Sequence, residues 1–116
     1  VMGIVADEAA SDGFALKGVT GNNGSGSGIS IAFDNIDISR YSAINVSVRA
    51  TQNIEFYDNS GTSIGGYGTY KTYTKVNVLT YLTKSNITTL QSLKIGRKSV
   101  PNIEIYIDKI ELVEKA

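Results

Sequence analysis

The sequence has 116 residues, with 11 basic and 11 acidic side chains and with neither cysteine nor histidine. The missing thiols and imidazoles exclude cysteine nucleophiles, histidine bases and zinc sites built from these residues. Zero net charge gives no general attraction to nucleic acid or membrane, and no apolar run approaches the roughly 20 residues that span a bilayer. The length predicts a single domain over residues 1–116 with a modest core.

Alternation of apolar and polar residues dominates the chain from residue 29 onward. A period of two is typical of strands that bury one face and expose the other. We therefore predict an all-β protein, an antiparallel β-sandwich whose sheets enclose one core. The predicted inward residues are Ile29, Ile31 and Phe33; Ile44, Val46, Val48 and Ala50; Ile54 and Phe56; Val76 and Val78; and Ile103, Ile105 and Ile107.

Turn signals separate these predicted strands. Residues 21–28 are rich in glycine, asparagine and serine and predict a long loop, without the lysine and hydroxyl pair of a phosphate-binding loop. Residues 58–61 read Asp-Asn-Ser-Gly and predict a tight turn that joins residues 53–57 to 62–65 as a hairpin. Residues 80–91 are less regular and are compatible with a short helical turn.

The last predicted strand changes phase. Its first isoleucines, up to Ile107, are odd-numbered, whereas Ile110 and Leu112 are even-numbered. If both sets face the core, a β-bulge near Asp108 must shift the phase. If the even set faces inward throughout, Asp108 is buried and needs a partner or a metal.

Four segments carry a resemblance to a known family. Residues 33–44 read like the entry into a strand, and residues 55–61 like a hairpin with the pattern y-D-x-x-G. Residues 73–78 take the place of a strand that often begins with tryptophan, and residues 106–112 resemble a closing y-i-D-x-I-x-L motif. In this order they resemble carbohydrate-binding modules with the galactose-binding-domain-like sandwich, a jelly roll.

The resemblance implies a function and a metal. Such modules are non-catalytic parts of secreted, multidomain enzymes that degrade polysaccharides, so we expect a secreted module, monomeric within a larger protein, with a polysaccharide or oligosaccharide as its partner. Many of them hold a structural calcium ion, whose ligands here would be Asp7 or Glu8 together with Asp108. The alternative is that Asp7 and Glu8 are solvated and that Asp108 caps a turn.

Glycan binding would depend on tyrosine, because the chain has no tryptophan. A flat ring stacks on the polarised C–H face of a sugar, and charged or amide groups bond its hydroxyls. By phase, Tyr57 and Tyr73 should point away from the core, and so should Arg49. The alternative is that the tyrosines cover sheet edges and form cross-strand pairs. The predicted binding residues are Tyr57, Tyr67, Tyr70 and Tyr73 for stacking, with Arg49, Asp58 and Arg97 for hydrogen bonding.

Charge is unevenly distributed along the chain. Residues 59–103 contain no acid and six bases, namely Lys71, Lys75, Lys84, Lys94, Arg97 and Lys98. This indicates either a solvated surface or a basic face for an anionic polysaccharide. Nothing in the spacing brings Glu55 and Glu104 together as a glycosidase pair, so we expect no catalysis. The competing hypothesis is a structural or adhesion sandwich of a cell-surface or phage-tail protein.

Overall fold

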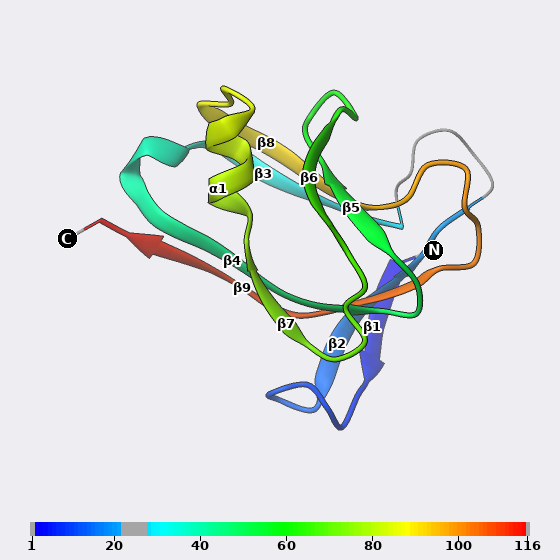
Figure 1. Ribbon diagram of the computed structural model, residues 1–116. Helices are drawn as coiled ribbons and strands as arrows, with labels where there is room; N and C mark the ends of the chain where they lie inside the picture. The colour runs from blue at the N-terminus through cyan, green and yellow to red at the C-terminus, as the bar shows by residue number, and fades with distance from the viewer. Residues whose placement is uncertain (1, 22–27, 116) are drawn as a thin grey trace.

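Two antiparallel β-sheets pack face to face in the computed structural model, which describes residues 2–21 and 28–115 (Figure 1). The predicted all-β antiparallel sandwich is confirmed. The five-stranded sheet has the order β1 (Met2–Ala6), β2 (Phe14–Val19), β9 (Glu104–Glu114), β4 (Tyr41–Ala50), β7 (Thr74–Asn77). The four-stranded sheet has the order β3 (Ile29–Asp37), β8 (Thr89–Gly96), β5 (Ile54–Tyr57), β6 (Ser63–Gly68).

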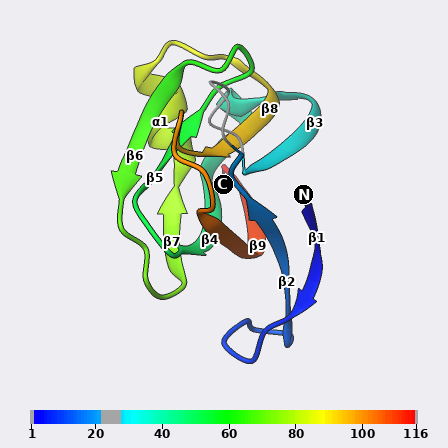
Figure 2. The same ribbon diagram turned by 90° about the vertical axis from the view of Figure 1, so that its right-hand side faces the viewer.

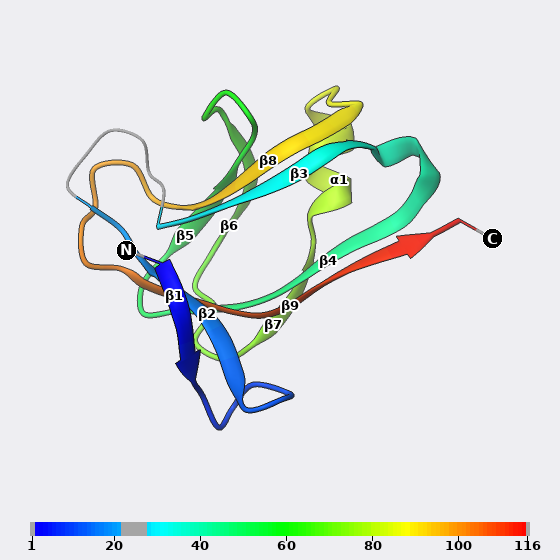
Figure 3. The same ribbon diagram turned by 180° about the vertical axis from the view of Figure 1, so that it is seen from behind.

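Successive strands often change sheets, as β2 to β3 and β4 to β5 do. This order is compatible with a jelly roll, and that finer topology stays a prediction. Viewed from the side and from behind, the turn of the β1–β2 hairpin projects away from the four-stranded sheet (Figures 2 and 3). Most of the predicted loop at residues 21–28 lies outside the described residues. No helix in the described ranges is long and apolar enough to cross a membrane.

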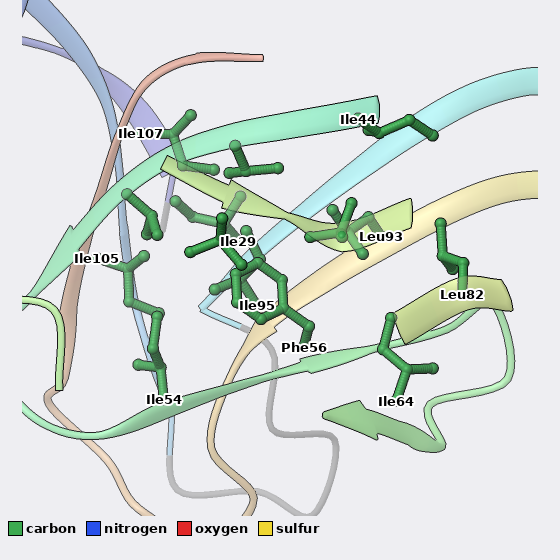
Figure 4. Packing of buried hydrophobic residues seen from close by; sticks show 14 of the residues in the cluster. Ile29, Ile44, Ile54, Phe56, Ile64, Leu82, Leu93, Ile95, Ile105 and Ile107 are labelled. Carbon is green, nitrogen blue, oxygen red and sulfur yellow. The ribbon is translucent and has the colours of Figure 1, made fainter. Parts of the chain in front are cut away.

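The core is built from the inward residues that the period-two pattern predicts. Phe56 and Ile95 lie between the sheets near Ile29, with Ile105 and Ile107 contributed by β9 (Figure 4). All the predicted inward residues belong to this cluster, although Ile31 and Phe33 are only partly buried. Burial of apolar area is the main stabilising term of such a fold, at roughly 25 cal/mol per Å².

A short helix replaces the end of one predicted strand. The alternation of Val76 and Val78 predicts a strand through both, but β7 ends at Asn77 and Val78 begins α1 (Val78–Lys84). The Asn77 side chain ends the strand, because its Oδ1 accepts from the backbone N of Leu79 at 3.2 Å and caps the helix. Val78 is buried as predicted, on a helix instead of a strand. The predicted helical turn in residues 80–91 is confirmed in its first part.

The phase change in β9 is a β-bulge, the first of the two alternatives that the sequence leaves open. Ser47 pairs with Lys109 while Val48 pairs with Ile107, so Asp108 has no partner in β4. Its carboxylate Oδ1 instead accepts from the backbone N of Ser11 at 3.0 Å and from Ser11 Oγ at 2.9 Å. The bulge therefore keeps both sets of β9 side chains facing the core and ties β9 to the loop between β1 and β2.

Candidate functional site

A row of polar and aromatic side chains crosses the outer face of the five-stranded sheet. Tyr106 pairs with Lys17 of β2 on one side and with Arg49 of β4 on the other. Because Ile105 and Ile107 on either side of Tyr106 face the core, these three side chains point outward. The predicted outward direction of Arg49 is therefore confirmed.

Arg49 contacts Asp7, Tyr73 and Tyr106, and we call these four residues the clamp. Asp7 Oδ2 accepts from Arg49 Nη2 at 2.7 Å, from Arg49 Nε at 3.3 Å and from the Tyr73 hydroxyl at 2.6 Å. The guanidinium carbon lies 3.8 Å from the centre of the Tyr106 ring and 5.4 Å from that of Tyr73. The clamp thus joins the loop after β1 to β4, β9 and the segment before β7.

The clamp strongly favours the ionised form of Asp7. Hydrogen bonds from Tyr73 and then Arg49 lower the pKa of Asp7 from 3.8 to about 2, against a smaller opposing effect of burial. Burial, reinforced by the bond to Asp7, raises the pKa of the Tyr73 hydroxyl. Because the acceptor and donor groups satisfy one another, the clamp has the character of a structural fastening. Tyr106 was not among the predicted site residues, although its place between inward isoleucines was the signal that could have found it.

The three predicted calcium ligands do not gather at one point. Asp7 faces the Arg49 guanidinium, Asp108 bonds to Ser11, and Glu8 is exposed. The described residues contain no cluster of three acidic side chains that could hold a metal. A cation already lies against Asp7 Oδ2, so calcium binding through this oxygen would require Arg49 to move. Asp7 Oδ2 is therefore engaged in the clamp, and calcium binding by Asp7, Glu8 and Asp108 stays a prediction.

A second group, the Tyr67 surface, consists of Asn53, Tyr67, Thr69 and Arg97 at one end of the four-stranded sheet. Tyr67 keeps 52% of its surface exposed. Its hydroxyl accepts from Asn53 Nδ2 at 2.8 Å, while Asn53 Oδ1 accepts from the Thr69 hydroxyl. The Arg97 guanidinium carbon lies 5.2 Å from the centre of the Tyr67 ring, within range of a cation–π contact. Two predicted binding residues, Tyr67 and Arg97, are therefore brought together.

Two further bases, Lys94 and Lys98, lie beside Tyr57 on the four-stranded sheet that carries the Tyr67 surface. Lys94 lies opposite Tyr57 on the outer face of β8, and Lys98 follows Arg97 directly in the chain. Within residues 2–21 and 28–115, none of these three bases forms an ion pair. The acid on this part of the sheet, Glu55, accepts from the Tyr57 hydroxyl at 2.9 Å. The local field therefore favours an anionic ligand.

The six bases of residues 59–103 do not form one face. Lys75 lies on the five-stranded sheet, 3.9 Å from Glu111, whereas Lys94 lies on the four-stranded sheet. Lys84 is in the last turn of α1. Arg97 lies beside Tyr67, while Lys94 and Lys98 lie beside Tyr57.

The prediction that Tyr57 presents an exposed ring for stacking is wrong. It does point away from Ile54 and Phe56, but it is only 1% exposed. The turn after β8 covers it: the backbone N of Lys98 donates to the Tyr57 hydroxyl at 3.2 Å, and Lys98 Nζ lies 5.5 Å from the ring centre. Strand alternation fixes the side of the sheet and carries no information about a loop that covers that side.

Two other predicted residues have local structural partners. Asp58 Oδ1 accepts from the backbone N of Ser60 at 2.9 Å and of Thr62 at 3.0 Å, which confirms the predicted turn and uses this oxygen in it. The Tyr70 hydroxyl donates to the carbonyl of Gly66 at 2.6 Å, and its ring packs against the core. Tyr73, predicted to leave the core, does so and joins the clamp.

Comparisons with known proteins find no matching family model, no matching curated protein and no matching solved structure.

Proposed function

We propose that this chain is a non-catalytic carbohydrate-binding module and that the Tyr67 surface is its glycan site. The single observation that carries the proposal is a half-exposed tyrosine ring bordered by a guanidinium, an amide and a hydroxyl. A sugar ring needs this combination, because it presents an apolar C–H face and a rim of hydroxyls. In a larger secreted enzyme, such a module would keep the catalytic domain near its polysaccharide.

The binding mechanism follows from the geometry of the Tyr67 surface. The exposed part of the Tyr67 ring would stack on one pyranose, while Arg97 and Asn53 would bond hydroxyls of that sugar or of the next one. The bond from Asn53 to the Tyr67 hydroxyl fixes the orientation of the ring before the ligand arrives. A fixed ring loses less conformational entropy on binding, which favours affinity.

The preferred ligand is a chain of uronic acids. Arg97, Lys94 and Lys98 supply positive charge, and Arg97 can bind a sugar carboxylate with two parallel hydrogen bonds. Neutral polysaccharides would use the same ring with lower affinity. Glu55 and Glu104 lie on outer faces of different sheets, so they do not form the facing carboxylate pair of a glycosidase.

Affinity gel electrophoresis tests this proposal directly. The protein should be retarded by a linear polyuronate and less by a neutral β-glucan, with retardation weakening as salt increases. Tyr67→Ala should abolish retardation, and Arg97→Gln should reduce it for the polyuronate more than for the neutral polymer. Phe14→Ala is the matched control, because Phe14 is an exposed ring, at 56%, on the distant β1–β2 hairpin.

Two outcomes would count against the proposal. Retardation that survives Tyr67→Ala but is lost in Phe14→Ala would place the site elsewhere. No retardation by any polymer would favour the structural or adhesion role. The same gels run with calcium and with a chelator test the calcium prediction, since a calcium-dependent module would lose retardation with chelator.

A further inference from the structure

A hollow opens at the other end of the sandwich from the Tyr67 surface. It is lined by residues of η1 (Ile38–Arg40) and α1 and by Lys115 just after β9, which lie toward the same end of the sandwich (Figures 1 and 3). β4 and β8 both start beside the hollow and run toward Asn53 and Arg97. The volume of the hollow is about 580 Å³, within the range of roughly 300–1,000 Å³ that is typical of small-molecule sites.

The floor of the hollow is apolar. Ile38, Tyr41, Leu79 and Ile87 line it, and each of them packs in or against the hydrophobic core. Hydroxyl groups stand at the margin, among them Thr83 on the exposed side of α1. An apolar floor with a polar margin suits a ligand that has an apolar body and one polar end.

Backbone hydrogen bonds hold the walls of the hollow in place. At the end of α1, the backbone N of Ile87 donates to Leu82 O at 3.0 Å and that of Asn86 donates to Thr83 O at 3.1 Å. These two bonds and the positive φ of Asn86, at 60°, form a Schellman motif. The unusual φ of Asn86 is therefore explained by the end of the helix. The walls also bond to each other: Ile38 N donates to Thr88 O at 3.1 Å, and Lys115 N donates to Arg40 O at 3.1 Å. The hollow is therefore preformed.

Charge at the margin is positive. Lys115 is the one charged residue among the described residues that line the hollow. The neighbouring charges are Arg40, Asp37, Lys84 directly after Thr83, and Glu114, which pairs with Tyr41 across the sheet. The Asp37 carboxylate is engaged by Ser39, whose backbone N and Oγ donate to it at 3.0 and 2.7 Å. The residues in and next to the hollow thus carry three cations against two carboxylates, a net charge of +1.

We propose that this hollow is a binding site for a small carboxylic acid with an apolar body, its carboxylate near Lys115 and its apolar part on Leu79 and Ile87. The site is separate from the Tyr67 surface, since the two lie at opposite ends of β4 and β8. Loss of one site therefore does not entail loss of the other.

The test is a titration followed by NMR of side-chain methyl groups, with 4-phenylbutyrate as the acid and 4-phenylbutanol as its neutral analogue. The acid should give saturable shifts of the Ile38, Leu79 and Ile87 methyls and should bind about fivefold more tightly than the alcohol, as one exposed ion pair allows. Lys115→Gln should weaken the acid to the affinity of the alcohol and leave the alcohol unchanged.

A pair of variants on one helix locates the site. Thr83→Tyr places a ring over the hollow and should abolish saturable shifts with both ligands. Thr80→Tyr, at an exposed position of α1 that does not line the hollow, should bind as the parent does. Thermal unfolding of both variants shows that they are folded. The proposal is overturned if neither ligand saturates, if Thr83→Tyr binds as the parent does, or if acid and alcohol bind equally.

Discussion

Asp7 and Arg49, 42 residues apart in the chain, form an ion pair of 2.7 Å whose carboxylate is only 8% exposed. The pair links the loop after β1 to the middle of the sheet, and Tyr73 completes it from a third segment. The sequence predicted that the Arg49 side chain binds a sugar. In the structure it holds the β1–β2 hairpin against the sheet. The stability of the fold should therefore depend on pH.

Stability should fall as Asp7 becomes protonated. The pKa of Asp7 is about 2 in the folded protein, below its ordinary value of 3.8, so the ionised clamp stabilises the fold fully above the ordinary value. This contribution is lost as the pH falls from about 5 toward about 2, because the unfolded chain binds the proton first. Urea midpoints of the parent and Asp7→Asn should differ clearly at pH 6 and converge as the pH approaches 2.

Glu8→Gln is the matched control for the pH experiment, since Glu8 is the exposed neighbour of Asp7. It should follow the parent across the whole range. A difference between Asp7→Asn and the parent that stays constant from pH 6 to 2 would contradict the role of the clamp carboxylate.

Glycine at position 66 is required by the core. Its φ is +73°, and an added Cβ would lie 2.4 Å from Phe56 Cδ1, an atom of a ring with no exposed surface. We expect Gly66→Ala to lower the free energy of unfolding by about 2–4 kcal/mol, from backbone strain and overpacking together. Chemical denaturation measures this directly.

Gly61→Ala separates the two causes in Gly66→Ala. Gly61 has a similar φ of +84°, but nothing lies within 4 Å of an added Cβ. Its cost should be the backbone strain alone, about 1 kcal/mol. Equal costs at the two positions would show that the contact with Phe56 is relieved cheaply.

Two of the four tyrosines predicted for stacking, Tyr57 and Tyr67, should respond differently to substitution. Tyr57 is buried and bonded to Glu55 and Lys98, so Tyr57→Ala should cost about 3–5 kcal/mol in the free energy of unfolding. Tyr67 is half exposed, and Tyr67→Ala should cost within about 1 kcal/mol while removing glycan binding. Thermal unfolding and affinity gels on the same two variants test both statements, and a strongly destabilised Tyr67→Ala would be evidence for a structural role of that ring.

Asn77 stabilises two elements through one oxygen. Its Oδ1 accepts from Leu79 N at 3.2 Å, which caps α1, and from Ile44 N at 3.1 Å in β4. Asn77→Ala should therefore lower the free energy of unfolding by about 2–3 kcal/mol, more than loss of an isolated cap. Asn77→Asp keeps the acceptor oxygen at the helix N-terminus and should stay close to the parent, as denaturation midpoints would show. If Asn77→Asp were destabilised as much as Asn77→Ala, the stabilisation would not come from the acceptor oxygen.

The fold was predictable because burial in a strand follows a local rule. The period of two from Ile103 to Ile107 fixes which side chains enter the core, and the change to Ile110 left two alternatives, of which the structure has the bulge at Asp108. The same rule failed at Val78, because the cap from Asn77 turned an alternating segment into a helix. Short-range hydrogen bonding outweighed the apolar pattern there.

For the candidate site, the sequence determined residue types and the side of each strand, and only the tertiary structure decided their neighbours. Tyr57 and Tyr67 have the same chemistry, yet the turn at Lys98 covers one of them and leaves the other open. Arg49 and Arg97 are equally suited to bind a sugar, yet Asp7 and Tyr106 occupy the first. The physical reason is the distance along the chain over which each effect acts. Alternation arises from bonds within one strand, whereas covering loops and charge partners come from segments tens of residues away.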